Sequence, residues 1–367
     1  MAALAVFALP KPAEAGSGTQ SVWLQPTRDL YPHRAAICLQ SYTQRADPPG
    51  VILSLQSEVE QFSHYRYTLQ RDSSPTGSPH DSRDGSIEVT FDADQPRSQQ
   101  IVVTIEAVSL WGRRSSPFSI TIAYHPRAVY AAAHQSSPSW IIVEASDLSL
   151  CGTRVDDWVV ENSWPESRAY ARKRWGDLVK ALRGDHERAK AIAHDLVRSL
   201  EPHSGIPSSR MQDLPAFEQL ARAEAGLDHV WCSNYAEIFS AACNEVGIAA
   251  RKIDMQYLWS SEAKTGLEIA EAHRTTEIFD RGLDRWVWMD LTFDILGAEL
   301  CGEMVNLAEM VEALHDKRRI QHLTFVEYDP VRGIESEVPA QRSRHLKDLL
   351  RFFRTDQRYQ YTRRVRS

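Results

Sequence analysis

The chain has 367 residues, of which 43% are hydrophobic and 25% charged, and its 42 Lys and Arg against 49 Asp and Glu give a formal net charge of −7. This globular composition argues against a wholly disordered or fibrous chain, and the length predicts two or three domains. The negative charge argues against a general nucleic-acid binder, and no run approaches the ~20 apolar residues of a membrane-spanning helix.

The five cysteines form an odd and sparse set. Their spacing matches neither a disulfide framework nor the paired CxxC motifs of a zinc site. The sequence also lacks a phosphate loop, a dinucleotide-binding fingerprint and an HExxH motif. We therefore expect no metal and no organic cofactor, while a single reactive thiol among structural cysteines stays open.

The start of the chain looks like the end of a secretory signal. Residues 1–9 form a short apolar run, and Ala13-Glu14-Ala15 has the small-x-small pattern of a cleavage site. This pattern predicts export to the periplasm or the cell exterior, with a start further upstream explaining the missing positive region. The alternative is a disordered Ala-rich segment over residues 1–20 of a cytoplasmic protein.

Between residues 21 and 127 the hydrophobic pattern has a period of two. Ile87, Val89 and Phe91 alternate with polar residues, and the alternation returns at residues 101–105. Such alternation buries one face of a strand, and the Pro-, Gly- and Ser-rich segments between the runs mark turns. About seven short strands predict an antiparallel β-sandwich.

Residues 101–124 resemble the last two strands of immunoglobulin-like or fibronectin-III-like modules. In those modules a strand ending in Trp-Gly, here Trp111-Gly112, turns through Ser-Ser-Pro into the final strand. The resemblance implies an immunoglobulin-like domain over residues 21–127. A spacer and a module that binds glycan or protein are both open, because a fold does not supply a function.

The hydrophobic period becomes helical in the second part of the chain. After a small, polar linker at residues 131–139, a strand at 140–143 is expected to open the next domain. Helices are then predicted at 165–184 and 185–201, followed by a third that contains the most informative cysteine.

Cys232 lies in the first turn of this third helix, which ends before Gly247, a residue typical of a helix C-terminus. The free N–H groups and positive dipole end of a helix start favour the thiolate, which is the nucleophilic form. A buried structural thiol is the alternative for Cys232. We expect Cys243, deeper on the same face, to be such a core residue.

A strand pair after this helix contains a histidine and an aspartate. If residues 280–283 form the hairpin loop, Phe279 faces Asp284 and His273 faces Asp290 across the strands. Cross-strand neighbours have Cβ atoms ~5 Å apart. An aspartate beside an imidazole fixes its tautomer and stabilises its charged form. Ordinary strand and turn roles are the alternative for the two residues.

The block from 225 to 293 resembles the transglutaminase-like superfamily of papain-type cysteine enzymes. The family shows a cysteine opening an aromatic-containing helix and then Gly-Ile-x-Ala-Arg, which residues 231–239 and 247–251 match. Its histidine strand and its Trp-x-x-x-Asp-x-Thr strand match residues 272–273 and 286–292.

The resemblance implies a transglutaminase-like α+β domain over residues 128–340. It implies that Cys232 is the nucleophile, His273 the general base and acid, and Asp290 the orienting carboxylate. Arg274 departs from the family pattern, in which an apolar or small residue usually follows the histidine.

Four further residues are candidates for the oxyanion or substrate site. The Cys232 backbone N–H at the helix start is the natural first oxyanion donor, and Trp231 or Asn234 would add to it. Trp286 and Trp288 share a strand face with the aspartate, so they either line the site or pack in the core.

The last segment, residues 341–367, contains nine basic and two acidic residues. Leu346, Leu349, Leu350 and Phe353 form an apolar stripe at helical spacing. The segment is expected to be a helix docked on the body of the protein. The alternative is a contact with an anionic polymer or a membrane surface.

Together these features predict an α+β chain in which a β-sandwich precedes a cysteine enzyme with a Cys–His–Asp triad. The expected reaction is acyl-enzyme chemistry on a protein or peptide amide through a thioester, with no specific nucleic-acid partner. Hydrolysis is favoured over transglutamination because water is always at hand. The rival is a non-catalytic binding or scaffolding protein, against which the presence of all three triad residues argues.

Overall fold

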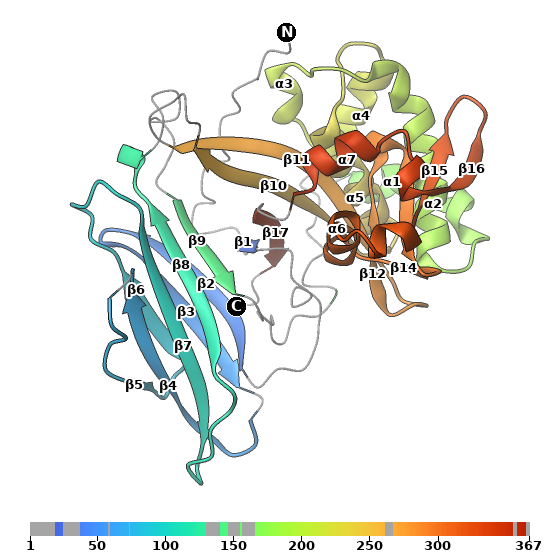
Figure 1. Ribbon diagram of the computed structural model, residues 1–367. Coiled ribbons are helices and arrows are strands. Elements are labelled where there is room, and N and C mark those ends of the chain that lie inside the picture. The colour runs from blue at the N-terminus through green and yellow to red at the C-terminus, as the bar shows by residue number, and fades with distance from the viewer. Residues whose placement is uncertain are drawn as a thin grey trace. The chain divides into compact units, whose positions relative to one another are not determined.

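The structure is a computed structural model in two compact units. It describes residues 19–24, 37–57, 59–72, 74–129, 140–145, 155, 166–260, 267–354 and 358–364. The segment over residues 1–20 that is predicted to be a signal or a disordered stretch lies outside the described residues up to residue 18, and residues 19 and 20 belong to the strand Thr19–Leu24. One unit is built from strands, and the other contains the α-helices together with two further sheets (Figure 1).

The first unit contains two antiparallel sheets. The order of the smaller is β2 (Ile37–Ala46), β3 (Pro49–Ser57), β6 (Ser86–Thr90); that of the larger is β5 (His80–Ser82), β4 (Phe62–Arg71), β7 (Gln99–Ser109), β8 (Phe118–His125), β9 (Trp140–Ala145). Alternate residues such as Leu53 and Val103 are fully buried, as strands with one core face require. Phe91 stacks on Tyr124 at 5.3 Å between ring centroids and joins the two sheets. The immunoglobulin-like topology stays a prediction.

Strand β9 corrects the expected boundary at residue 128. It pairs antiparallel with β8, with Ile122 opposite Val143 and Tyr124 opposite Ile141. The first unit therefore extends past residue 140, and this strand does not open the second domain. The physical reason is that an edge strand presents unpaired N–H and C=O groups, which the next extended segment of the chain can satisfy.

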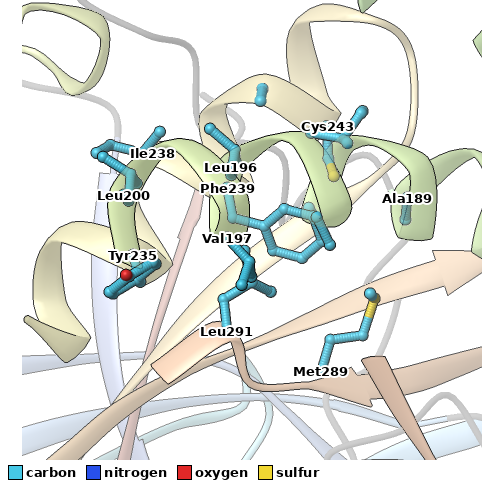
Figure 2. Close-up of a cluster of buried hydrophobic side chains, with 14 of the residues drawn as sticks. Ala189, Leu196, Val197, Leu200, Tyr235, Ile238, Phe239, Cys243, Met289 and Leu291 are labelled. Carbon is cyan, nitrogen blue, oxygen red and sulfur yellow. The ribbon is translucent and has the colours of Figure 1, made fainter. Parts of the chain in front are cut away.

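A layer of helices begins the second unit. The helices are α1 (Ser167–Lys180), α2 (Asp185–Leu200), α3 (Ser209–Gln212), α4 (Ala216–Glu224) and α5 (Cys232–Glu245). Their apolar faces pack into one core, in which Phe239 and Cys243 of α5 gather with Val197 of α2 (Figure 2). Met289 and Leu291 belong to the same cluster. Cys243 is fully buried, and burial raises the pKa of its thiol, so it is the predicted core cysteine.

Two further sheets complete this unit. One has the order β1 (Thr19–Leu24), β17 (Arg358–Arg364), β10 (Ala250–Ser260), β11 (Leu267–Asp280), β12 (Arg285–Met289); the other has β14 (Glu303–Met304), β13 (Ile295–Leu300), β15 (Leu323–Asp329), β16 (Ile334–Pro339). The helices α6 (Leu307–His315) and α7 (Leu346–Phe352) follow in the chain. Short 3-10 helices lie at Arg127–Val129 (η2), Glu201–His203 (η5), Leu291–Phe293 (η6), Arg319–His322 (η7) and Ala340–Arg342 (η8). Helices and antiparallel sheets in one chain agree with the predicted α+β class.

The β11–β12 hairpin differs from the predicted register by two residues. The structure pairs Phe279 with Trp286 and Asp280 with Arg285, not Phe279 with Asp284. The strand continues through Asp280 because its carboxylate accepts hydrogen bonds from the backbone N–H groups of Gly282 and Leu283, which fixes the loop one residue later. A shift of two keeps every side chain on its predicted face, because the side-chain period of a strand is two.

The basic C-terminal segment contains both a helix and a strand. Helix α7 covers part of the predicted stripe, with Leu349 and Phe353 buried but Leu350 exposed. The chain then enters β17, a strand that the helical pattern did not predict. This strand pairs antiparallel with β10. Contact of this segment with an anionic surface stays a prediction.

Candidate active site

The thiol of Cys232 lies at the first residue of α5 and is half-buried. The helix start is held by Asn234, whose side-chain oxygen accepts a hydrogen bond from the Trp231 backbone N–H at 3.1 Å. Its amide nitrogen donates to the Gln219 side chain on α4 at 2.8 Å. Asn234 is buried and bonded at both ends, and it fixes where the helix begins. Trp231 precedes the thiol as the N-cap residue.

The loop that leads into α5 is organised by Asp228. Its carboxylate accepts hydrogen bonds from the backbone N–H and hydroxyl of Ser208, at 2.8 and 2.5 Å, and from Arg222 Nε at 2.9 Å. Burial raises the pKa of this carboxyl, but these bonds outweigh burial and hold it well below the usual range. No periodic pattern in the sequence marks Asp228, because its partners Ser208 and Arg222 lie 20 and 6 residues earlier in the chain.

His273 on β11 and Asp290 at the end of β12 are in direct contact. His273 Nε2 lies 2.6 Å from Asp290 Oδ2, and both side chains are almost completely buried. The other carboxylate oxygen, Oδ1, accepts the Thr292 backbone N–H at 3.1 Å, so Asp290 also caps η6. In the observed register Asp290 is the diagonal neighbour of His273, a position still within reach of a side chain.

Aromatic rings surround the imidazole. The centroid of the His273 ring lies 5.1 Å from that of Phe293, 5.6 Å from Phe352 and 5.5 Å from Phe353. The backbone carbonyl of Phe353 lies 2.5 Å from His315 Nε2, which ties this segment to α6. The predicted apolar stripe therefore supplies part of the wall around the histidine, a role that only the fold assigned to it.

The thiol of Cys232 and the imidazole of His273 act on each other, and each shifts the pKa of the other. Burial works against the charged form of both groups. The carboxylate of Asp290 and the Cys232 thiolate nevertheless raise the pKa of His273 to about 10. Interactions with the His273 side chain and with the Arg274 backbone N–H lower the pKa of Cys232 below its ordinary value. Together these shifts favour a thiolate beside an imidazolium at neutral pH.

The two candidate tryptophans of β12 are both buried but have different surroundings. Trp288 Nε1 donates to the Thr275 hydroxyl at 2.8 Å, and its ring meets the edge of Phe353, which packs on His273. Trp286 instead lies under the guanidinium of Arg251, 3.9 Å from its ring centroid. Trp288 thus supports the wall around the histidine, whereas Trp286 packs in the core.

The described part of the chain has neither a metal-binding cluster nor a membrane-spanning helix. No group of three or more His, Cys, Asp or Glu residues there could hold a metal ion. No helix there is long and apolar enough to cross a membrane.

No family model and no curated protein matches this chain. Among solved structures it is similar to a candidate cysteine protease from Cytophaga hutchinsonii, with 11% identity, a TM-score of 0.27 and 75% of each chain covered. It is also similar to a candidate protease from Parabacteroides distasonis, with 11% identity and a TM-score of 0.25, over 78% of this chain and 63% of that one. Both TM-scores are low, so these similarities do not determine the chemistry of the site.

Proposed function

We propose that the protein is a cysteine hydrolase of the transglutaminase-like type, which cleaves protein or peptide amides through an acyl-enzyme. The observation that carries this proposal is the His273 imidazole, which Asp290 holds at 2.6 Å and which lowers the pKa of the thiol at the start of α5. A nucleophile, a base and a group that orients the base are the parts that such chemistry needs.

The reaction begins from the thiolate–imidazolium pair. The Cys232 thiolate attacks the carbonyl carbon of the amide, and His273 gives its proton to the leaving nitrogen as the C–N bond breaks. The products of this half-reaction are a free amine and a thioester on Cys232. His273, now neutral, takes a proton from water, whose oxygen attacks the thioester and releases the acid. As the C–S bond breaks, Cys232 leaves as the thiolate beside the protonated His273, and the ion pair is restored.

The negative oxygen of the tetrahedral intermediate needs hydrogen-bond donors. The backbone N–H of Cys232 is suited to this role, because the first N–H groups of a helix have no partner within the helix. Asn234 is assigned to capping, since its amide nitrogen is already bonded to Gln219. Asp290 keeps the imidazole oriented, and the phenylalanine rings around His273 restrict the water that reaches it.

Alkylation by iodoacetamide tests this proposal, because the reagent reports the thiolate without a known substrate. Cys232 is expected to react faster than the exposed Cys301 in the same molecule at pH 6–7, where an ordinary thiol with a pKa of about 8.5 is protonated. His273→Ala should remove this advantage without changing the Cys301 rate. Equal rates at both cysteines in the unchanged protein would overturn the proposal.

A peptide mixture incubated with the protein and read by mass spectrometry tests the cleavage itself. New peptide ends should form with the unchanged protein and be missing with Cys232→Ala. A reactive Cys232 with no cleaved or transferred product would favour the non-catalytic binding protein.

A further inference from the structure

Four charged side chains from three elements of the second unit form two neighbouring ion pairs. Glu237 lies on α5, Lys252 and Asp254 on β10, and Arg274 on β11. Lys252 forms an ion pair with Glu237, and Arg274 Nε donates to Asp254 Oδ1. These side chains are partly exposed, unlike His273 and Asp290, so the two ion pairs meet solvent.

Arg274 stands out because only one edge of its guanidinium is used. Asp254 accepts from Nε, and among the described residues neither terminal amino group of Arg274 has a hydrogen bond. The side chain is 29% exposed. An arginine fork presents five N–H donors, so the unused edge is directed to form two parallel hydrogen bonds with a carboxylate.

The position of Arg274 ties this unused edge to the thiol. It directly follows His273 in β11, and its backbone N–H and its charge both help to lower the pKa of the Cys232 thiol. Glu237 and Asp290 are each paired with another cation, Lys252 and His273 respectively. Asp254 holds one edge of the guanidinium, and this contact fixes the direction of the other edge.

We infer that Arg274 is a specificity-determining residue, which binds a carboxylate of the substrate close to the scissile amide. The inference rests on the proposed function and specifies its substrate as an acidic peptide. Arg274 contacts the substrate in this scheme, and Asp254 acts through it as a positioning residue. The alternative role, in which the guanidinium only favours the thiolate, would act equally on neutral and anionic substrates.

Iodoacetate and iodoacetamide form a matched pair of probes for this difference. Both reagents alkylate the thiolate, but only iodoacetate has a carboxylate. The ratio of the iodoacetate rate to the iodoacetamide rate at Cys232 is therefore independent of the fraction of thiol that is ionised. Arg274→Gln should lower this ratio about 3- to 10-fold, the effect of one charge ~6 Å away in a solvated site. Arg274→Lys should recover much of it, because the charge remains.

Arg285→Gln is the control for a general loss of charge. Arg285 has nearly the same exposure, 27%, and is also paired with a carboxylate, that of Glu309 on α6. Its replacement should leave the ratio within twofold of that of the unchanged protein. Cys301, read in the same sample, serves as the internal reference for each reagent.

The two proposals fail in different ways. If Cys232 is no faster than Cys301 toward iodoacetamide, the proposed function fails. If Cys232 is fast but Arg274→Gln leaves the ratio unchanged, or changes it no more than Arg285→Gln does, the substrate inference alone is overturned. If Arg274→Gln lowers the iodoacetate and iodoacetamide rates at Cys232 equally, the substrate inference is also overturned, and Arg274 acts by stabilising the thiolate.

Discussion

At the scale of single residues, the properties of the site depend on the coupling of one thiol to one imidazole. Burial alone would favour the neutral form of each group. The contact of His273 with Asp290 and the interaction between the thiol and the imidazole reverse this. The thiolate–imidazolium pair should therefore persist from the lowered pKa of Cys232 up to the raised pKa of His273, about 10.

Asp290→Asn should move the acid limb of the Cys232 alkylation profile to higher pH. Without the carboxylate the imidazolium loses its main support, so the pKa of His273 falls and that of Cys232 rises toward its ordinary value of about 8.5. Amide cleavage should fall about 10²- to 10⁴-fold, the range of general acid–base catalysis. The measurements are the alkylation rate against pH and the cleavage rate.

Asp316→Asn provides the matched control for Asp290→Asn. The Asp316 carboxylate also accepts a backbone N–H two residues on, from Arg318, but it is a surface residue after α6. The Cys232 alkylation profile of the Asp316→Asn variant should coincide with that of the unchanged protein. An Asp290→Asn profile that does so too would contradict the assigned role of Asp290.

At the scale of elements, the start of α5 determines where the thiol lies. Asn234→Ala removes the acceptor of the Trp231 N–H and the donor to Gln219, and loss of a cap of this kind costs about 1–2 kcal/mol. We expect slower alkylation of Cys232 per folded molecule in addition to this loss, because the first turn is no longer fixed.

Asn306→Ala separates the two effects of Asn234→Ala. Asn306 caps α6 and accepts the Glu309 backbone N–H, so its loss should cost a similar free energy of unfolding. The Cys232 alkylation rate should not change in this variant. A rate that falls equally in both variants would show that Asn234 acts only through stability.

A buried ion pair joins the neighbouring strands β10 and β11. Arg251 and Glu277 are almost fully buried, and Glu277 also accepts the Leu307 backbone N–H at 2.7 Å. Glu277→Gln leaves the guanidinium buried without a counter-charge and should lower the unfolding free energy by about 3–5 kcal/mol. Glu88→Gln, which breaks an exposed pair with Arg45, should cost less than about 1 kcal/mol. Denaturant unfolding measures both, and equal losses would contradict the assignment.

At the scale of the whole molecule, stability should depend on pH through a buried histidine. His186 at the start of α2 makes a 2.7 Å hydrogen bond from Nε2 to the Leu296 carbonyl on β13. Burial lowers its pKa, an effect to which Lys190 adds and which the Leu296 carbonyl, Glu187 and Asp280 oppose. Below the ordinary pKa of histidine, His186 therefore binds a proton in the unfolded state more readily than in the folded state.

The unfolding free energy should therefore fall as the pH drops below about 6.5, the ordinary value of histidine, by up to about 1.4 kcal/mol per pH unit from this group. His186→Gln should be less stable at pH 7.5 but should show a flatter dependence between pH 6.5 and 5. A slope equal to that of the unchanged protein would assign the acid sensitivity to other groups.

The sequence by itself determined what local pattern can encode. Period-two alternation predicted strands such as β7 and β8, and helical spacing with Gly247 predicted α5 with Cys232 in its first turn. The face shared by Asp290 and Trp288 also followed from the sequence, because strand parity survives a register error of two residues. These features depend on neighbours within a few positions.

Only the tertiary structure decided the features that depend on distant partners. β9 belongs to the first unit because the edge of β8 pairs with it, and the register of the β11–β12 hairpin depends on the bonds of Asp280. Phe353 joins the wall around His273, and Asp228 fixes the approach to α5, through contacts across the chain. Such contacts form between elements that packing brings together, and their energies leave no periodic signal in the sequence.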